Sequence, residues 1–218
     1  MTPRFDTFIF DLDGTLLDTL PDLVINTNMA LEQMGYPIRD EQEVLASVGE
    51  GLPVLIRRLL PEGSTEAEAE ATMDCWKRIY PEYGRKTTQE YPGTTDMLKT
   101  LQSRGIKTAV LSNKFNKGTQ ELISDFFPGL FQIVHGEGAS IPRKPNPTGL
   151  LLTMEELGAK PETTVYVGDS VGDIEVARKA HVASIGAAWG CYGAEILEAA
   201  NADIIAYSPS ELLTYTFE

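Results

Sequence analysis

The sequence places acidic, hydroxyl and amine side chains just beyond four short apolar segments. These side chains belong to Asp11, Asp13, Ser112, Lys144, Asp169 and Asp173. In a doubly wound parallel sheet, ligands bind beyond the carboxyl ends of the strands. If the apolar segments are strands of one such sheet, the carboxylates, the hydroxyl and the ammonium meet at a single edge.

Such a cluster predicts a magnesium site with room for a phosphoryl group beside it. Crowded carboxylates repel one another and take up protons unless a cation neutralises them. Mg²⁺ suits an all-oxygen shell made of carboxylates, waters and substrate oxygens. We therefore expect Mg²⁺ as the cofactor and a small phosphorylated metabolite as the binding partner.

The spacing of these residues also suggests individual tasks. Asp11, nearest to its strand end, can attack phosphorus and form an aspartyl phosphate. Asp13 lies two residues further on and points the same way in an extended segment. When protonated, it can give its proton to the leaving oxygen and later take one from the attacking water. Ser112 and Lys144 can hold the remaining oxygens and offset the charge that develops during transfer.

The segments that position these residues alternate between strand and helix patterns. Strands are expected at 7–10, 107–111, 132–134, 164–167, 183–185 and 203–205. Helices are expected between them, at 94–103, 118–127, 147–157, 172–180, 193–200 and 210–215. This alternation predicts an α/β fold: a doubly wound parallel sheet, or Rossmann-like core, with helices on both faces.

One region interrupts the alternation with helical spacing alone. Helices are expected there at 20–34, 40–47, 53–60 and 65–83. We therefore expect an all-helical cap domain at 18–87, inserted into a core made of 1–17 and 88–218. The chain leaves and re-enters the core at neighbouring points, which would make a hinge.

Four short motifs occur in order along the chain. They are Asp11-Leu12-Asp13-Gly14-Thr15, Ser112-Asn113, Lys144-Pro145 and Gly168-Asp169-Ser170-Val171-Gly172-Asp173. This set resembles the motifs of the haloacid dehalogenase-like hydrolases. The resemblance implies that Asp11 is the nucleophile and Asp13 the general acid and base, with Ser112, Asn113 and Lys144 around the substrate phosphate. It also implies that Mg²⁺ is held by the Asp11 side chain, the Asp13 carbonyl and Asp169, with Asp173 acting directly or through water.

Within that family, the helical insertion looks like the mobile cap of phosphatases that act on small metabolites. The segments Val48-Gly49-Glu50-Gly51 and Ser112-Asn113-Lys114 are most similar to phosphoglycolate phosphatases. Gly49, Glu50 and Gly51 would form the cap loop that faces the substrate. The sequence departs from the subgroup at Glu50, because an acid there repels a second anionic group such as a carboxylate. It departs again at His181, which replaces a common glycine and is expected to affect a helix end.

Composition limits the classes of partner. The 218 residues include 18 Lys and Arg against 32 Asp and Glu, a formal net charge of −14, which disfavours nucleic acid. No stretch approaches the ~20 apolar residues that span a bilayer, so no membrane association is expected. The start of the chain lacks an export signal, and Cys75 and Cys191 lie far apart, so we expect a cytoplasmic protein. We expect it to be a monomer or a homodimer.

Other interpretations remain open at this point. The same motifs serve a phosphomutase of the β-phosphoglucomutase type, and a catalytically silent regulator that binds phosphorylated ligands would also keep them. A calcium loop starting at Asp11 is disfavoured, because its sixth and twelfth positions are Leu16 and Asp22 rather than glycine and glutamate. The glycines at 186–190 match no dinucleotide or phosphate-loop signature. Arg57 and Arg58 are expected to pair with acids of the cap, the commoner arrangement, or to reach a substrate.

Overall fold

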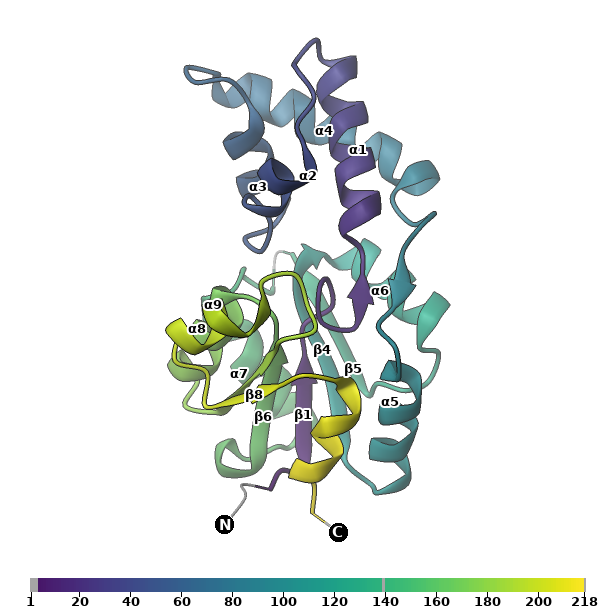
Figure 1. The fold of residues 1–218 in the computed structure, drawn as a ribbon, viewed down its shortest axis with the longest axis vertical. Coiled ribbons are helices and arrows are strands. Elements are labelled where there is room, and N and C mark those ends of the chain that lie inside the picture. The colour runs from purple at the N-terminus through teal and green to yellow at the C-terminus, as the bar shows by residue number, and fades with distance from the viewer. Residues whose placement is uncertain (1–3, 139, 218) are drawn as a thin grey trace. The chain divides into compact units, whose positions relative to one another are not determined.

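A computed structural model describes residues 4–138 and 140–217 of the chain. The chain divides into two compact units (Figure 1). The core unit comprises Met1–Leu17 and Glu90–Glu218, and the helical unit comprises Asp18–Gln89. Among the described residues, no helix combines the length and apolar character needed to cross a membrane.

The core unit is built on a six-stranded sheet in the order β5-β4-β1-β6-β7-β8 (Figure 1). Its strands are β1 (Thr7–Phe10), β4 (Lys107–Phe115), β5 (Ile133–Glu137), β6 (Thr164–Gly168), β7 (Ala183–Ala187) and β8 (Ile204–Ala206). Every neighbouring pair runs parallel. The chain order reverses between β1 and β6, so the crevice beyond these two strands is the topological switch point, where ligands bind in such sheets.

Alternating side chains build one core layer on each face of the sheet. Phe8 and Phe10 of β1 pack with residues of α5 (Thr94–Ser103) and α6 (Asn116–Phe126). Ile9 packs on the other face with residues of α7 (Thr148–Leu157) and α8 (Val171–Lys179). α9 (Gly193–Ala199) packs against β7, and the 3₁₀ segment η2 (Pro209–Tyr215) packs against α5. The predicted doubly wound α/β fold is therefore confirmed.

The helical unit consists of α1 (Leu20–Gln33), α2 (Glu41–Leu45), α3 (Leu52–Leu59) and α4 (Glu66–Tyr83). Asp40 and Thr65 form capping boxes at the starts of α2 and α4, which satisfy amide groups that the helices leave unpaired. α1 and α4 pack along each other, and the Trp76 indole N–H donates to Thr27 Oγ1 at 3.2 Å. The expected all-helical insertion is present.

The two connecting segments pair with each other as short strands that the sequence did not predict. β2 (Leu17–Asp18) and β3 (Gln89–Glu90) form a two-stranded sheet. Strands of two residues carry no alternation that a pattern search can detect. Beside this sheet, the buried Asp22 carboxylate accepts hydrogen bonds from the backbone N–H and the hydroxyl of both Thr87 and Thr88.

Two expected boundaries in the core differ from the structure. β4 continues to Phe115 instead of ending at residue 111, with an irregular register against β5 between Ser112 and Phe115. The last expected α-helix is the 3₁₀ segment η2, which ends where Thr216 forms a β-bridge with Phe5.

Candidate active site

The carboxylates of Asp11, Asp169 and Asp173 meet at the switch point. Asp11 follows β1, and its backbone N–H donates to the Val167 carbonyl near the end of β6 at 2.9 Å. One carboxylate oxygen from each of the three acids lies within 4.8 Å of the others. All three acids are buried. The predicted meeting of residues from separate strand ends therefore occurs for this set.

Lys144 is buried against the same acids. Its Nζ lies 2.8 Å from Asp11 Oδ1 and donates to Asp173 Oδ1 at 2.7 Å and to the Tyr166 hydroxyl at 2.9 Å. Burial on its own lowers the pKa of Lys144, but the charges of Asp11 and Asp173 raise it well above the usual range. Lys144 is therefore an ammonium at neutral pH.

A single buried ammonium does not offset three buried acids. Burial raises the pKa of Asp11 to about 7; the charge of Lys144 opposes the shift, and that of Asp173 adds to it. Burial also raises the pKa of Asp169, again with a contribution from Asp173. A positive charge placed among these groups would favour their ionised forms.

The donor set fits Mg²⁺. The converging atoms are carboxylate oxygens, the ligand type that Mg²⁺ prefers. Asp11 Oδ1 is buried and accepts no well-aligned hydrogen bond from the described residues, although Lys144 lies close to it. Such an oxygen retains lone pairs for a cation or a substrate group.

Asp13 lies in the loop after β1 and pairs with Lys114. Lys114 Nζ donates to the two Asp13 carboxylate oxygens at 3.1 and 3.4 Å. Gly14 follows with a φ of +82°, and a Cβ on it would lie 2.2 Å from Asp169 Oδ2. Only glycine fits there, because a side chain would collide with Asp169 and strain the backbone.

The loop after β7 also holds Asp169, a contact that the sequence did not predict. The Cys191 N–H donates to Asp169 Oδ2 at 2.9 Å, and the Trp189 indole N–H donates to the Thr15 carbonyl at 2.9 Å. A Cβ on Gly190 would lie 2.2 Å from the Gly14 carbonyl oxygen. The signal that the sequence offers for this contact is a glycine shortly after the strand expected at 183–185.

Ser112 and Asn113 lie in the irregular end of β4. Val110 pairs with Phe10, so Ser112 lies just beyond the β1 end that carries Asp11. Asn113 binds the backbone of Lys144: its amide NH₂ donates to the Lys144 carbonyl at 3.1 Å, and its Oδ1 accepts the Lys144 N–H at 2.6 Å. The Asn113 amide therefore positions Lys144, a contact that the sequence did not predict.

Asp173 uses both of its carboxylate oxygens within the protein. Oδ1 accepts the bond from Lys144, and Oδ2 accepts bonds from the Ser170 N–H and hydroxyl at 3.0 and 2.7 Å. The Ser170 contacts form the capping box of α8. Asp173 thus stabilises a helix start and anchors the lysine at the same time.

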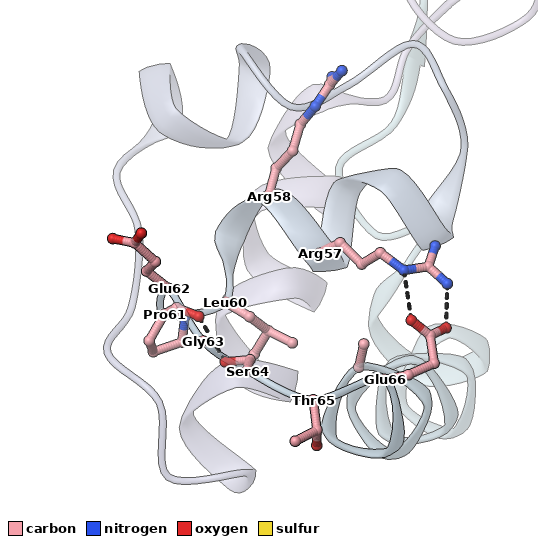
Figure 2. A pocket seen from close by; sticks show the side chains of 10 residues that line it. Arg57, Arg58, Leu60, Pro61, Glu62, Gly63, Ser64, Thr65 and Glu66 are labelled. Atoms are coloured by element: carbon pink, nitrogen blue, oxygen red, sulfur yellow. Dashed lines mark hydrogen bonds and ion pairs between the residues drawn. The ribbon is translucent and has the colours of Figure 1, made fainter.

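Gly49, Glu50 and Gly51 belong to the helical unit, not to the unit that holds the acidic cluster. Both glycines have positive φ values, 102° and 83°, and Glu50 forms an ion pair with Arg58 of α3. Arg57 pairs with Glu66 at the rim of a pocket beside the α3–α4 loop (Figure 2). The expected pairing of both arginines with cap acids is confirmed.

Taken together, these features define a Rossmann-like α/β protein with an acidic, all-oxygen site at the switch point of its sheet and an inserted helical unit. The chain belongs to the haloacid dehalogenase-like hydrolase family, whose sequence model matches residues 8–187. The resemblance seen in the four motifs is confirmed.

Known relatives and solved structures agree with this assignment. The chain is 35% identical over 211 residues to a phosphoglycolate phosphatase of Vibrio parahaemolyticus, covering 94% of this chain and 92% of that protein. A crystal structure from Lactobacillus delbrueckii subsp. bulgaricus superposes with a TM-score of 0.91 at 30% identity, covering 99% of this chain and 100% of that one. A predicted phosphoglycolate phosphatase from Haemophilus somnus 129PT superposes with a TM-score of 0.89 at 29% identity, covering 98% and 99% of the two chains.

Proposed function

We propose that this protein is a magnesium-dependent phosphatase that hydrolyses small phosphomonoesters through a phospho-aspartyl intermediate. The convergence of Asp11, Asp169, Asp173 and Lys144 at the switch point carries the proposal. The names of the relatives support it.

In the first step, Asp11 attacks phosphorus and the bond from phosphorus to the ester oxygen breaks. The leaving oxygen keeps the bonding electrons and takes a proton from Asp13. In the second step, Asp13 takes a proton from water, which attacks the aspartyl phosphate and releases inorganic phosphate with Asp11 regenerated. Lys114 Nζ donates to Asp13 Oδ1 at 3.1 Å and so fixes the position of this carboxylate.

We assign the metal ligands as the Asp11 and Asp169 carboxylates and the Asp13 backbone carbonyl. Asp173 would contribute through water, because both of its carboxylate oxygens already accept hydrogen bonds from Lys144 and Ser170. Bound Mg²⁺ supplies positive charge that offsets the charge of the phosphoryl group. Ser112 and Lys144 hold the phosphoryl oxygens.

We propose a phosphoglycolate-like substrate and a helical unit that acts as the cap. The Arg58 guanidinium pairs with Glu50 within the helical unit, which offsets part of the repulsion between this acid and a substrate carboxylate. The free thiols of Cys75 and Cys191 suit a reducing, cytoplasmic compartment.

Phosphate release from phosphoglycolate, sugar phosphates and nucleotides, with Mg²⁺ or with EDTA, tests the proposal. Asp11→Asn should abolish turnover because an amide is a poor nucleophile, whereas Asp96→Asn, at an exposed position on α5, should leave turnover unchanged. Full activity of Asp11→Asn, or hydrolysis in EDTA, would exclude the mechanism. Free phosphate equal to the substrate consumed would exclude the phosphomutase alternative, and no hydrolysis of any compound would favour the silent regulator.

A further inference from the structure

Tyr166 is a buried polar side chain that the proposed mechanism does not use. It lies within β6, is 1% exposed, and packs in the apolar layer formed with α7 and α8. Its aromatic ring fits that layer, but a hydroxyl in an apolar layer is costly unless it is hydrogen-bonded. The partners of this hydroxyl therefore indicate why a tyrosine is present.

The hydroxyl has one donor bond and one acceptor bond. It donates to the Leu111 carbonyl at 2.7 Å and accepts from Lys144 Nζ at 2.9 Å. Because its only proton is directed at Leu111, a lone pair is left to face the ammonium. Leu111 immediately precedes Ser112, so this pair of bonds fixes Lys144 relative to the end of β4.

Lys144 has as many donors as it has close acceptors. An ammonium carries three N–H groups. Its Nζ donates to Tyr166 and to Asp173, and it lies 2.8 Å from Asp11 Oδ1. With two N–H groups committed to Tyr166 and Asp173, one N–H group remains for the neighbouring Asp11 carboxylate or for a phosphoryl oxygen.

We propose that Tyr166 is a positioning residue, whose hydroxyl holds the Lys144 ammonium in the orientation that serves Asp11 and the phosphoryl group. The inference rests on the proposed function. In this role Tyr166 acts through Lys144, because its hydroxyl is bonded to Lys144 and to the Leu111 carbonyl. Asn113 performs the matching task for the backbone of Lys144, so the side chain and the main chain of this lysine are held by different residues.

Tyr166→Phe tests the proposal, because it removes the hydroxyl and keeps the ring. The kcat for phosphoglycolate should fall by about tenfold, the effect of losing one hydrogen bond to a charged group. The KM should change by less than about twofold, because Ser112 and Lys144 still bind the phosphate in the ground state. A purely structural loss would lower the melting temperature without this split between kcat and KM.

Thr164→Val is the matched control. Thr164 is buried at the opposite end of β6, and its hydroxyl donates to the Lys160 carbonyl at 2.8 Å. The control therefore removes a buried hydroxyl bond from the same strand without touching Lys144. Its kcat should equal that of the wild type.

A second measurement needs neither substrate nor metal. In protein labelled with ¹⁵N-lysine, the Lys144 ammonium signal, identified by its loss in Lys144→Arg, reports hydrogen exchange with water. The wild type should exchange slowly, because Lys144 is buried and hydrogen-bonded. Tyr166→Phe should accelerate exchange by about tenfold, again the effect of one such hydrogen bond, and Thr164→Val should not.

The two measurements separate the possible outcomes. A Tyr166→Phe protein with wild-type kcat and unchanged Lys144 exchange would overturn the positioning role. Faster Lys144 exchange in Tyr166→Phe, together with a wild-type protein that hydrolyses no phosphomonoester, would support the contact and refute the proposed function. A fall in kcat with unchanged exchange would also refute the positioning role, because Lys144 would then not carry the effect.

Discussion

Without a bound metal, the fold disfavours the ionised form of Asp11. Its pKa is raised from the ordinary value of 3.8 to about 7, chiefly by burial. The folded state therefore holds a proton that the unfolded chain has already released between these two values. Stability should fall as pH rises through this window.

Thermal unfolding in EDTA between pH 4 and pH 8 checks this expectation. The wild type should lose stability across the range, whereas Asp11→Asn should lose less, because its amide does not ionise. Added Mg²⁺ should reduce the loss in the wild type, because a cation at the acidic cluster stabilises the ionised carboxylates. Parallel curves for the wild type and Asp11→Asn in EDTA would contradict the raised pKa.

Gly190 has no side chain, which allows the loop after β7 to approach Gly14 and Asp169 closely. An added Cβ would lie 2.2 Å from the Gly14 carbonyl oxygen and 2.4 Å from Asp169 Cβ. Gly190→Ala must displace the loop after β1 or Asp169, and both carry proposed metal ligands. We expect weaker Mg²⁺ binding and loss of most activity.

A Mg²⁺ titration followed by tryptophan fluorescence measures the Mg²⁺ affinity, because the Trp189 indole is hydrogen-bonded to Thr15 in the loop after β1. Gly138→Ala is the control, since a Cβ there meets no described atom within 4 Å. Equal Mg²⁺ affinity in Gly190→Ala and the wild type would show that the close approach is not required.

At the scale of elements, Asp22 joins the start of α1 to the returning segment before β3. Burial on its own raises the pKa of Asp22, but hydrogen bonds from Thr88 and Thr87 outweigh it and hold the pKa below the usual value. The ionised carboxylate therefore stabilises the fold above the ordinary pKa of 3.8, and this contribution disappears as pH falls through the lowered value.

Asp22→Asn should lower the free energy of unfolding at pH 7 by about 2 kcal/mol, since an amide cannot accept all of these bonds. Urea unfolding at pH 7 measures the difference. Asp74→Asn, at an exposed position on α4, should have almost no effect. If the two substitutions cost the same, the bonds to Thr87 and Thr88 contribute little.

Helix ends are among the local features that can be predicted from a single sequence. His181, singled out because glycine is common at its position, follows α8 with a φ of 58°, the left-handed conformation that favours glycine at a helix end. The capping residues Asp40 and Thr65 also match boundaries expected from the sequence. Each of these features depends on the type of a single residue, so it can be read from one chain.

For the whole molecule, the sequence predicted the sheet, the inserted helices and the acids at the switch point, because each follows from the spacing of apolar and charged residues. It did not predict the hydrogen bonds from Asn113 to the Lys144 backbone, the bond from Lys144 to the Tyr166 hydroxyl, or the close approach of Gly190 to Gly14 and Asp169. Tyr166 lies within an apolar strand, where an aromatic residue is ordinary. The Cys191 contact with Asp169 uses a backbone N–H, which every residue except proline provides.

The net charge of the whole protein affects how it attracts its substrate. The formal charge of −14 repels a phosphorylated metabolite at long range. Attraction must therefore arise within the site itself, where Lys144 provides a buried ammonium group and Lys114 a partly buried one beside the proposed metal ligands.

The order of the sheet also affects how the chain acquires its structure. β1 lies between β4 and β6, yet the whole helical unit separates β1 from β4 along the chain. β1 is therefore synthesised well before β4 and β6, the two strands with which it pairs. Helices fold through local contacts, so an early-folding insertion would bring its two ends together and shorten the span that β1 must close to meet β4.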